Sequence, residues 1–139
     1  MTTSTAARKA APPSTRSDSL LRTALRLDAV VTGANGLAYL AAAPLLDDLL
    51  GLPGALLRGA GAFLLAYAVA VWLVGAGPRI SRAAVEAVVA ANGLWAIGSV
   101  VAVVTGAGSP TTVGAVWLVL QAAVVAGFAA LQITALRHR

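Results

Sequence analysis

The chain has 139 residues, of which 59% are hydrophobic and 11% are charged, and its formal net charge is +5. Soluble domains carry about 25% charged residues, so this composition excludes a water-soluble globular fold and indicates an integral membrane protein. The chain has no cysteine and a single histidine, His138, which excludes disulfides and a haem or zinc site, and no cofactor is expected. The basic residues flank apolar runs and form no patch with interleaved aromatic residues, so no nucleic-acid partner is expected.

The first segment, residues 1–19, is rich in Ser, Thr, Ala and Pro and has no apolar periodicity. We predict a disordered cytoplasmic arm here and a membrane domain over residues 20–139, with Asp18 or Ser19 as the helix cap before Leu20. Two processing alternatives compete with this interpretation. One is signal-peptide cleavage near "LAAAP", although the peptide would exceed the usual length of about 15–30 residues; the other is an organellar transit peptide.

Four apolar runs follow, at about 29–46, 55–76, 84–105 and 113–133. A helix needs about 20 residues to cross a hydrocarbon core about 30 Å thick, and these runs are Ala/Leu-rich and lack the alternation of a strand. Turn residues separate them, in "GLPG", "GAGPRIS" and "GAGSPTT". Because such short connections make neighbouring helices antiparallel, we predict an all-α fold, a four-helix transmembrane bundle with up-down-up-down topology. Pro44 is a candidate kink in the first run.

Lysine and arginine set the predicted orientation. All but one of the ten Lys and Arg residues lie on one side of the predicted membrane, and Arg58 lies on the other. The positive-inside rule therefore places both termini in the cytoplasm and the protein in the cell inner (plasma) membrane. The residues on the cytoplasmic side are Arg8, Lys9, Arg16, Arg22, Arg26, Arg79, Arg82, Arg137 and Arg139.

Polar side chains interrupt the apolar runs, and those of the first run share one face. At about 100° per residue, Asp28, Thr32, Asn35 and Tyr39 fall within a narrow arc of the helix. An unpaired polar group facing lipid costs several kcal/mol, so this face is expected to turn toward other helices. Its candidate partners on the third and fourth runs are Asn92, Gln121 and Gln132.

Two interpretations of this polar face compete. In the functional one, Asp28 and Asn35 line a proton or ion path with the glutamines of the fourth run, since intramembrane ionisable groups are candidates for function. In the structural one, Asp28 lies half-solvated at the cytoplasmic headgroup level beside arginines, and the amides form interhelical hydrogen bonds worth about 0.6 kcal/mol each. We favour the structural interpretation because Asp28 lies at the start of its run.

Two further patterns concern helix packing. "GANGLAYL" at 33–40 is similar to "AANGLWAI" at 90–97, which equates Asn35 with Asn92 and leaves open whether the chain contains a true internal repeat. Small residues one turn apart let helix backbones approach closely. Gly98 and Gly106 are accordingly predicted to be helix-packing contacts.

The stretches "RLDAVVTGANG", "LGLPGALLRGAG", "ANGLWAIGSV", "SPTTVGAVWLVLQ" and "FAALQITALRHR" resemble a family of small, uncharacterised bacterial integral membrane proteins. The resemblance covers everything after the arm. It implies four spans and no assigned activity, so no functional residue is carried over. A more distant likeness, to small four-helix oxidoreductase-associated (DoxX-like) membrane proteins, rests on size and helix count.

The sequence shows no catalytic triad, P-loop, glycine fingerprint or metal spacing, so no enzyme is expected. The favoured function is a non-catalytic integral membrane protein that acts through helix packing. Its expected partners are the lipid bilayer and either a second copy or another membrane protein. The alternative is a small channel or transporter that uses the polar face of the first run with Gln121 and Gln132. A membrane-embedded enzyme, or a subunit of one, is the third and least favoured interpretation.

Overall fold

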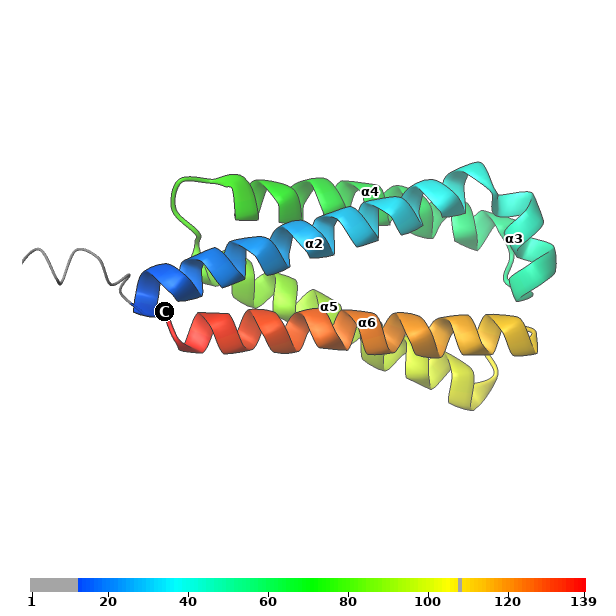
Figure 1. Ribbon diagram of the computed structural model, residues 1–139. Coiled ribbons are helices and arrows are strands. Elements are labelled where there is room, and N and C mark those ends of the chain that lie inside the picture. The colour runs from blue at the N-terminus through cyan, green and yellow to red at the C-terminus, as the bar shows by residue number, and fades with distance from the viewer. Residues whose placement is uncertain (1–12, 108) are drawn as a thin grey trace, which may run out of the picture.

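The computed structural model describes residues 13–107 and 109–139, and every regular element within them is an α-helix. The predicted all-α class is confirmed. Figure 1 shows four long helices running side by side, with the short α3 across one end near the start of α6. The helices are α2 (Pro13–Ala41), α3 (Ala43–Leu50), α4 (Gly54–Ala76), α5 (Arg82–Thr105) and α6 (Thr112–Arg137).

Three helices, α4, α5 and α6, are long and apolar enough to cross a membrane, and α2 with α3 counts as a fourth candidate if the bent pair is one span. The predicted first span, 29–46, is wrong as a continuous helix, because α2 ends at Ala41 and α3 leaves at an angle of 95°. Pro44 explains the break. A proline has no backbone N–H to donate to the preceding turn, and it is tolerated where it lies here, in the first turn of a new helix.

The first described helix also begins earlier than expected. Of the predicted arm, residues 1–12 lie outside the described residues, whereas 13–19 form the first turns of α2. These turns are held by the other end of the chain. The Ser17 hydroxyl donates to the carbonyl of His138 at 2.7 Å, and the Arg139 guanidinium lies 2.7 Å from the carboxylate of Asp18.

The interfaces between helices differ in closeness. α2 packs most extensively on α4, and α5 on α6, whereas the backbones of α4 and α5 stay apart although a short loop joins them. At the α2–α4 interface a Cβ atom added to Gly61 would lie 2.8 Å from the carbonyl oxygen of Gly36. Real Cβ atoms do not approach a backbone oxygen so closely, so only glycine fits at this crossing.

The two glycines predicted as contact points behave differently. A Cβ atom added to Gly98 or to Gly106 would meet no atom of the described residues within 4 Å, so neither glycine packs against a neighbouring helix of the same chain. Gly106 instead ends α5 in the left-handed conformation, with φ of 69°, which glycine adopts without strain. In an alanine-rich sequence small residues occur on every helix face, so their spacing alone did not identify the close crossing.

Apolar side chains form one cluster at each end of the helices. The cluster at the end near the C-terminus includes Leu21, Leu25, Val71, Val85 and Leu136. At the opposite end α3 completes a second cluster, which includes Tyr39, Ala43, Leu50, Leu57 and Leu64. The polar side chains singled out from the sequence lie between and beside these two clusters.

Candidate functional site

The carboxyl group of Asp28, on α2, is completely buried. It accepts hydrogen bonds from the hydroxyl of Thr32 at 3.0 Å, from Nδ2 of Asn92 on α5 at 2.8 Å and from Nε2 of Gln132 on α6 at 2.9 Å. All three neighbours donate. An ionised carboxylate only accepts, so it satisfies every one of these bonds.

This environment corrects the favoured interpretation of Asp28, which placed it half-solvated beside arginines. The ion pairs among the described residues are Arg82–Glu86 and Arg139–Asp18, and Asp28 has side-chain amides as partners instead. The interpretation failed because α2 extends well upstream of Asp28. The turns of α2 that precede Asp28 separate it from the end of the helices.

Two arginines that precede Asp28 on α2 contact α4 instead. The Arg22 guanidinium donates to the carbonyl of Gly77 at 2.6 Å, and also to that of Gly75, which satisfies carbonyls at the C-terminal end of α4. The Arg26 guanidinium lies over the ring of Trp72, 5.4 Å from its centroid. Both arginines thus contact α4, and neither pairs with the carboxyl group of Asp28.

Asn92 connects the buried carboxyl group to the remaining helix. Its Nδ2 also lies 3.3 Å from Oε1 of Gln132, and its Oδ1 accepts from the hydroxyl of Tyr67 on α4 at 3.2 Å. Asp28, Thr32, Tyr67, Asn92 and Gln132, hereafter the Asp28 cluster, therefore join α2, α4, α5 and α6. No buried side-chain nitrogen or oxygen in the described part of the chain lacks a partner.

Sequence reasoning brought four of these residues into one candidate set but missed Tyr67. The phenol lies in the middle of the second apolar run, where a hydroxyl needs a partner, and that signal was available. Its long side chain spans the gap between α4 and α5, where its hydroxyl also lies 3.2 Å from the carbonyl of Val88.

The rest of the predicted polar face divides into two separate contacts. Nδ2 of Asn35 donates to Oε1 of Gln121 on α6 at 3.2 Å, an interhelical bond of the kind expected for these amides. The Tyr39 hydroxyl accepts from the indole nitrogen of Trp117 at 2.8 Å. The shared helical face is therefore real as geometry, but its members meet different partners along the length of α2.

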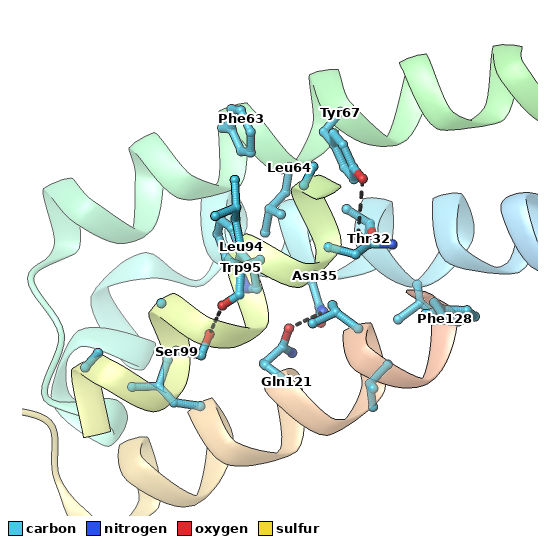
Figure 2. Close-up of a pocket in the computed structure, with 18 of the residues that line it drawn as sticks. Thr32, Asn35, Phe63, Leu64, Tyr67, Leu94, Trp95, Ser99, Gln121 and Phe128 are labelled. Carbon is cyan, nitrogen blue, oxygen red and sulfur yellow. Dashed lines mark hydrogen bonds between the residues drawn. The ribbon is translucent and has the colours of Figure 1, made fainter. Parts of the chain in front are cut away.

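A pocket of about 600 Å³ lies beside the Asp28 cluster and is lined by residues of all four long helices. Figure 2 shows Phe63, Tyr67 and Trp95 on one side of it and the Asn35–Gln121 pair on the other. The rings of Phe63 and Trp95 are nearly parallel, with centroids 6.3 Å apart. Most of the lining is apolar, and it is partly open to the surroundings.

Neither a metal-ligating group nor a relative assigns a chemistry to this site. Within residues 13–107 and 109–139, no three His, Cys, Asp or Glu residues are grouped so that they could hold a metal ion. Comparison of the chain with protein-family models, curated proteins and solved structures finds no match. The family resemblance therefore stays a prediction, and the function of the site is inferred from its geometry.

Proposed function

We propose that the chain is a four-span integral membrane protein without catalytic activity, which acts through packing of its helices with a second copy or with another membrane protein. The observation that best supports the arrangement of the four spans is the Asp28 cluster. Its hydrogen bonds join all four long helices, and they form only when the four helices are in register. In hydrocarbon, no water replaces a lost partner, so the cluster specifies one arrangement of the spans.

The arrangement of charge supports a membrane orientation with both termini in the cytoplasm. The described start of α2, the α4–α5 loop and the C-terminus lie at one end of the helices in Figure 1. That end carries every arginine of the described residues except Arg58, as the positive-inside rule requires of a cytoplasmic face. In this proposal the first span runs through α2 in the inner (plasma) membrane. It ends in α3, which lies along the outer surface.

Reporter fusions test the orientation. An enzyme reporter that is active only in the cytoplasm, fused after Arg139, is expected to be active. The same reporter fused within residues 51–53 is the matched control and is expected to be inactive. Activity of a periplasm-specific reporter at Arg139 would overturn the proposed topology.

Photo-crosslinking in the membrane tests the proposed mode of action. Ile97 is 63% exposed on α5, beside alanines of α6 that form a shallow groove, and small residues let a further helix approach closely. A photoreactive residue at position 97 is expected to give a protein adduct, whereas one at the buried Leu21 gives none. The proposal would be contradicted if position 97 and a second exposed site, such as Val69, gave adducts with lipid only and none with protein.

A proton-coupled or ion transporter is the second candidate, and one observation favours it. Thr32, Tyr67 and Asn92 belong to the Asp28 cluster and also line the pocket, so the intramembrane carboxyl group lies one side chain away from an accessible space. Proton flux into vesicles containing the wild type is expected to fall in Asp28→Asn and to persist in the control Asp48→Asn. A wild type as silent as empty vesicles would dismiss this candidate.

A further inference from the structure

We propose that the pocket between α4 and α5 binds an uncharged, lipid-soluble molecule with an apolar body and one hydroxyl or carbonyl group, which is held by Asn35 and Gln121. This inference goes beyond helix packing and requires only that the chain lies in a bilayer. The volume of about 600 Å³ falls within the range of about 300–1,000 Å³ that is usual for small-molecule sites. An apolar lining with a few convergent polar groups is also the usual composition of such sites.

The Asn35–Gln121 pair has hydrogen-bonding capacity that the protein does not use. Among the described residues, the bond from Asn35 Nδ2 to Gln121 Oε1 is the only one that either side chain makes. A primary amide carries two N–H groups and an accepting oxygen, so Oδ1 of Asn35 and Nε2 of Gln121 remain available. Both residues line the pocket and are only partly buried. A ligand hydroxyl can accept from Gln121 and donate to Asn35.

The Asp28 cluster shows by contrast what a completed polar site in this chain looks like. There, Asn92 is 3% exposed and bonds to three side chains. The pair at Asn35 has one bond and faces an open space. A polar ligand atom would complete it in the same way that Asp28 completes the amide of Asn92.

The depth of the pair argues for a ligand that carries its own polar group into the hydrocarbon. Gln121 lies about 14 Å along α6 from Thr112, at about 1.5 Å per residue, in a helix about 39 Å long crossing a core about 30 Å thick. The pair is therefore inside the hydrocarbon core. A phospholipid keeps its polar groups at the surface, and its acyl chain offers no hydrogen-bonding atom at this depth. A long-chain alcohol or an apolar ketone does offer one.

The walls of the pocket supply room and a lateral entrance. Phe63 and Leu94 are 56% and 70% exposed, on the two helices whose backbones stay apart, so the pocket meets the lipid between α4 and α5. Gly98 lines the pocket, and its missing side chain leaves space that no neighbour within 4 Å fills. The flat faces of Phe63 and Trp95 suit an apolar body beside that space.

Photolabelling of the full chain in phosphatidylcholine vesicles tests the proposal. The probe is a hexadecanol that carries a diazirine, and the adducts are located by mass spectrometry. We expect adducts on peptides that line the pocket, and we expect an excess of unlabelled 1-hexadecanol to remove them while hexadecane does not. Equal competition by hexadecane would show a purely apolar site and overturn the proposal. The proposal would also be overturned if a photoreactive phosphatidylcholine labelled the pocket and an excess of 1-hexadecanol did not reduce this labelling.

Variants on α5 provide a matched pair. Gly98→Leu fills the pocket and is expected to abolish the competable labelling. Gly93→Leu makes the same change on the same helix. An added Cβ at Gly93 also meets nothing within 4 Å, but Gly93 does not line the pocket. This variant is expected to be labelled as the wild type is. Labelling of Gly98→Leu equal to that of Gly93→Leu, in variants with unchanged circular dichroism, would contradict the site.

The polar anchor has its own variant and control. Asn35→Leu combined with Gln121→Leu is expected to erase the preference for the alcohol over the alkane, whereas Thr134→Val, a polar-to-apolar change elsewhere on α6, is expected to keep it. A preserved preference in the double variant would overturn the role of the amides.

Flotation of the chain with the vesicles, measured first, separates the two proposals. If the chain does not float, the membrane assignment is wrong. If it floats but shows no competable labelling, only this inference is wrong.

Discussion

Asn35 and Asn92 occur in the same local sequence, "ANGL", yet the fold places them in opposite environments. Both line the pocket, but Asn92 is buried and bonds to Asp28, Gln132 and Tyr67, whereas Asn35 is only partly buried and has one bond, to Gln121. The residue type and the flanking residues are equal, so the spacing of the surrounding helices makes the difference. Where the side chains of four helices converge, an amide holds the structure together. Where α4 and α5 separate, the same amide is left with capacity for a ligand.

The largest loss of stability is expected when the carboxyl group of Asp28, the acceptor at the centre of the Asp28 cluster, is removed. Asp28→Leu removes the acceptor of the hydrogen bonds from Thr32, Asn92 and Gln132. Because each buried hydrogen-bonding group left without its partner costs about 1–3 kcal/mol and the losses are not fully additive, we expect the free energy of unfolding to fall by about 4 kcal/mol. Unfolding by SDS in mixed micelles, followed by circular dichroism, measures it. Asp48→Leu, at an exposed position of α3, is the control, and equal stability of the two variants would refute the role of the cluster.

The next contrast is between the closest and the loosest helix contacts. Gly61→Leu forces a side chain against the backbone of Gly36, and overpacking of this kind costs about 3 kcal/mol. Gly98→Leu enters open space and is expected to leave the unfolding free energy nearly unchanged. The same SDS titration compares them, and a larger loss in Gly98→Leu than in Gly61→Leu would reverse the described packing.

The two asparagines themselves give the sharpest form of the comparison. Asn92→Leu removes three bonds from the Asp28 cluster and is expected to cost about 2 kcal/mol, whereas Asn35→Leu removes one interhelical bond, worth about 0.6 kcal/mol in a membrane. The experiment is a titration of both variants in one detergent. Equal losses would mean that burial does not distinguish the two sites.

The smallest effects are expected among the arginines at the basic end. Arg22→Ala uncovers two carbonyls at the end of α4 and is expected to cost about 1.5 kcal/mol. Arg82→Ala breaks a pair with Glu86 in which both side chains are more than half exposed, and such pairs contribute about 0.3 kcal/mol. Thermal denaturation in detergent ranks the two, and a more damaging Arg82→Ala would show that the exposed pair has a role beyond its local contact.

The sequence predicted the helices better than the depth of their residues. The runs at 55–76, 84–105 and 113–133 correspond closely to α4, α5 and α6. For Asp28 and Thr32, periodicity identified the shared face correctly. Periodicity does not say how far that face lies from water, and hydropathy placed the boundary at Asp28. The earlier turns of α2 bury Leu21 and Leu25 completely, so the protein interior begins well before the apolar run does.

The pocket was beyond sequence reasoning for a related reason. Its existence depends on α4 and α5 separating, and no residue pattern specifies that separation. The two glycine positions illustrate this: Gly61 lies at a close crossing and Gly98 faces a void, although both have alanines within four residues along the chain. The sequence identified Gln121 and Gln132 as polar residues on one helix. Only the tertiary structure shows that Gln132 bonds to Asp28 and that Gln121 lines the pocket.

The bond between Gln132 and Asp28 joins residues 104 positions apart, and this separation has a consequence for biosynthesis. The ribosome completes the first helix long before it has made the last partner of its carboxyl group. Until the final helix arrives, that carboxyl group has to be hydrated or held by a chaperoning surface. In the proposed bilayer, a chain truncated before residue 132 is therefore expected to keep an Asp28 that lacks its bond from Gln132 and to insert its first helix less stably than the full chain does.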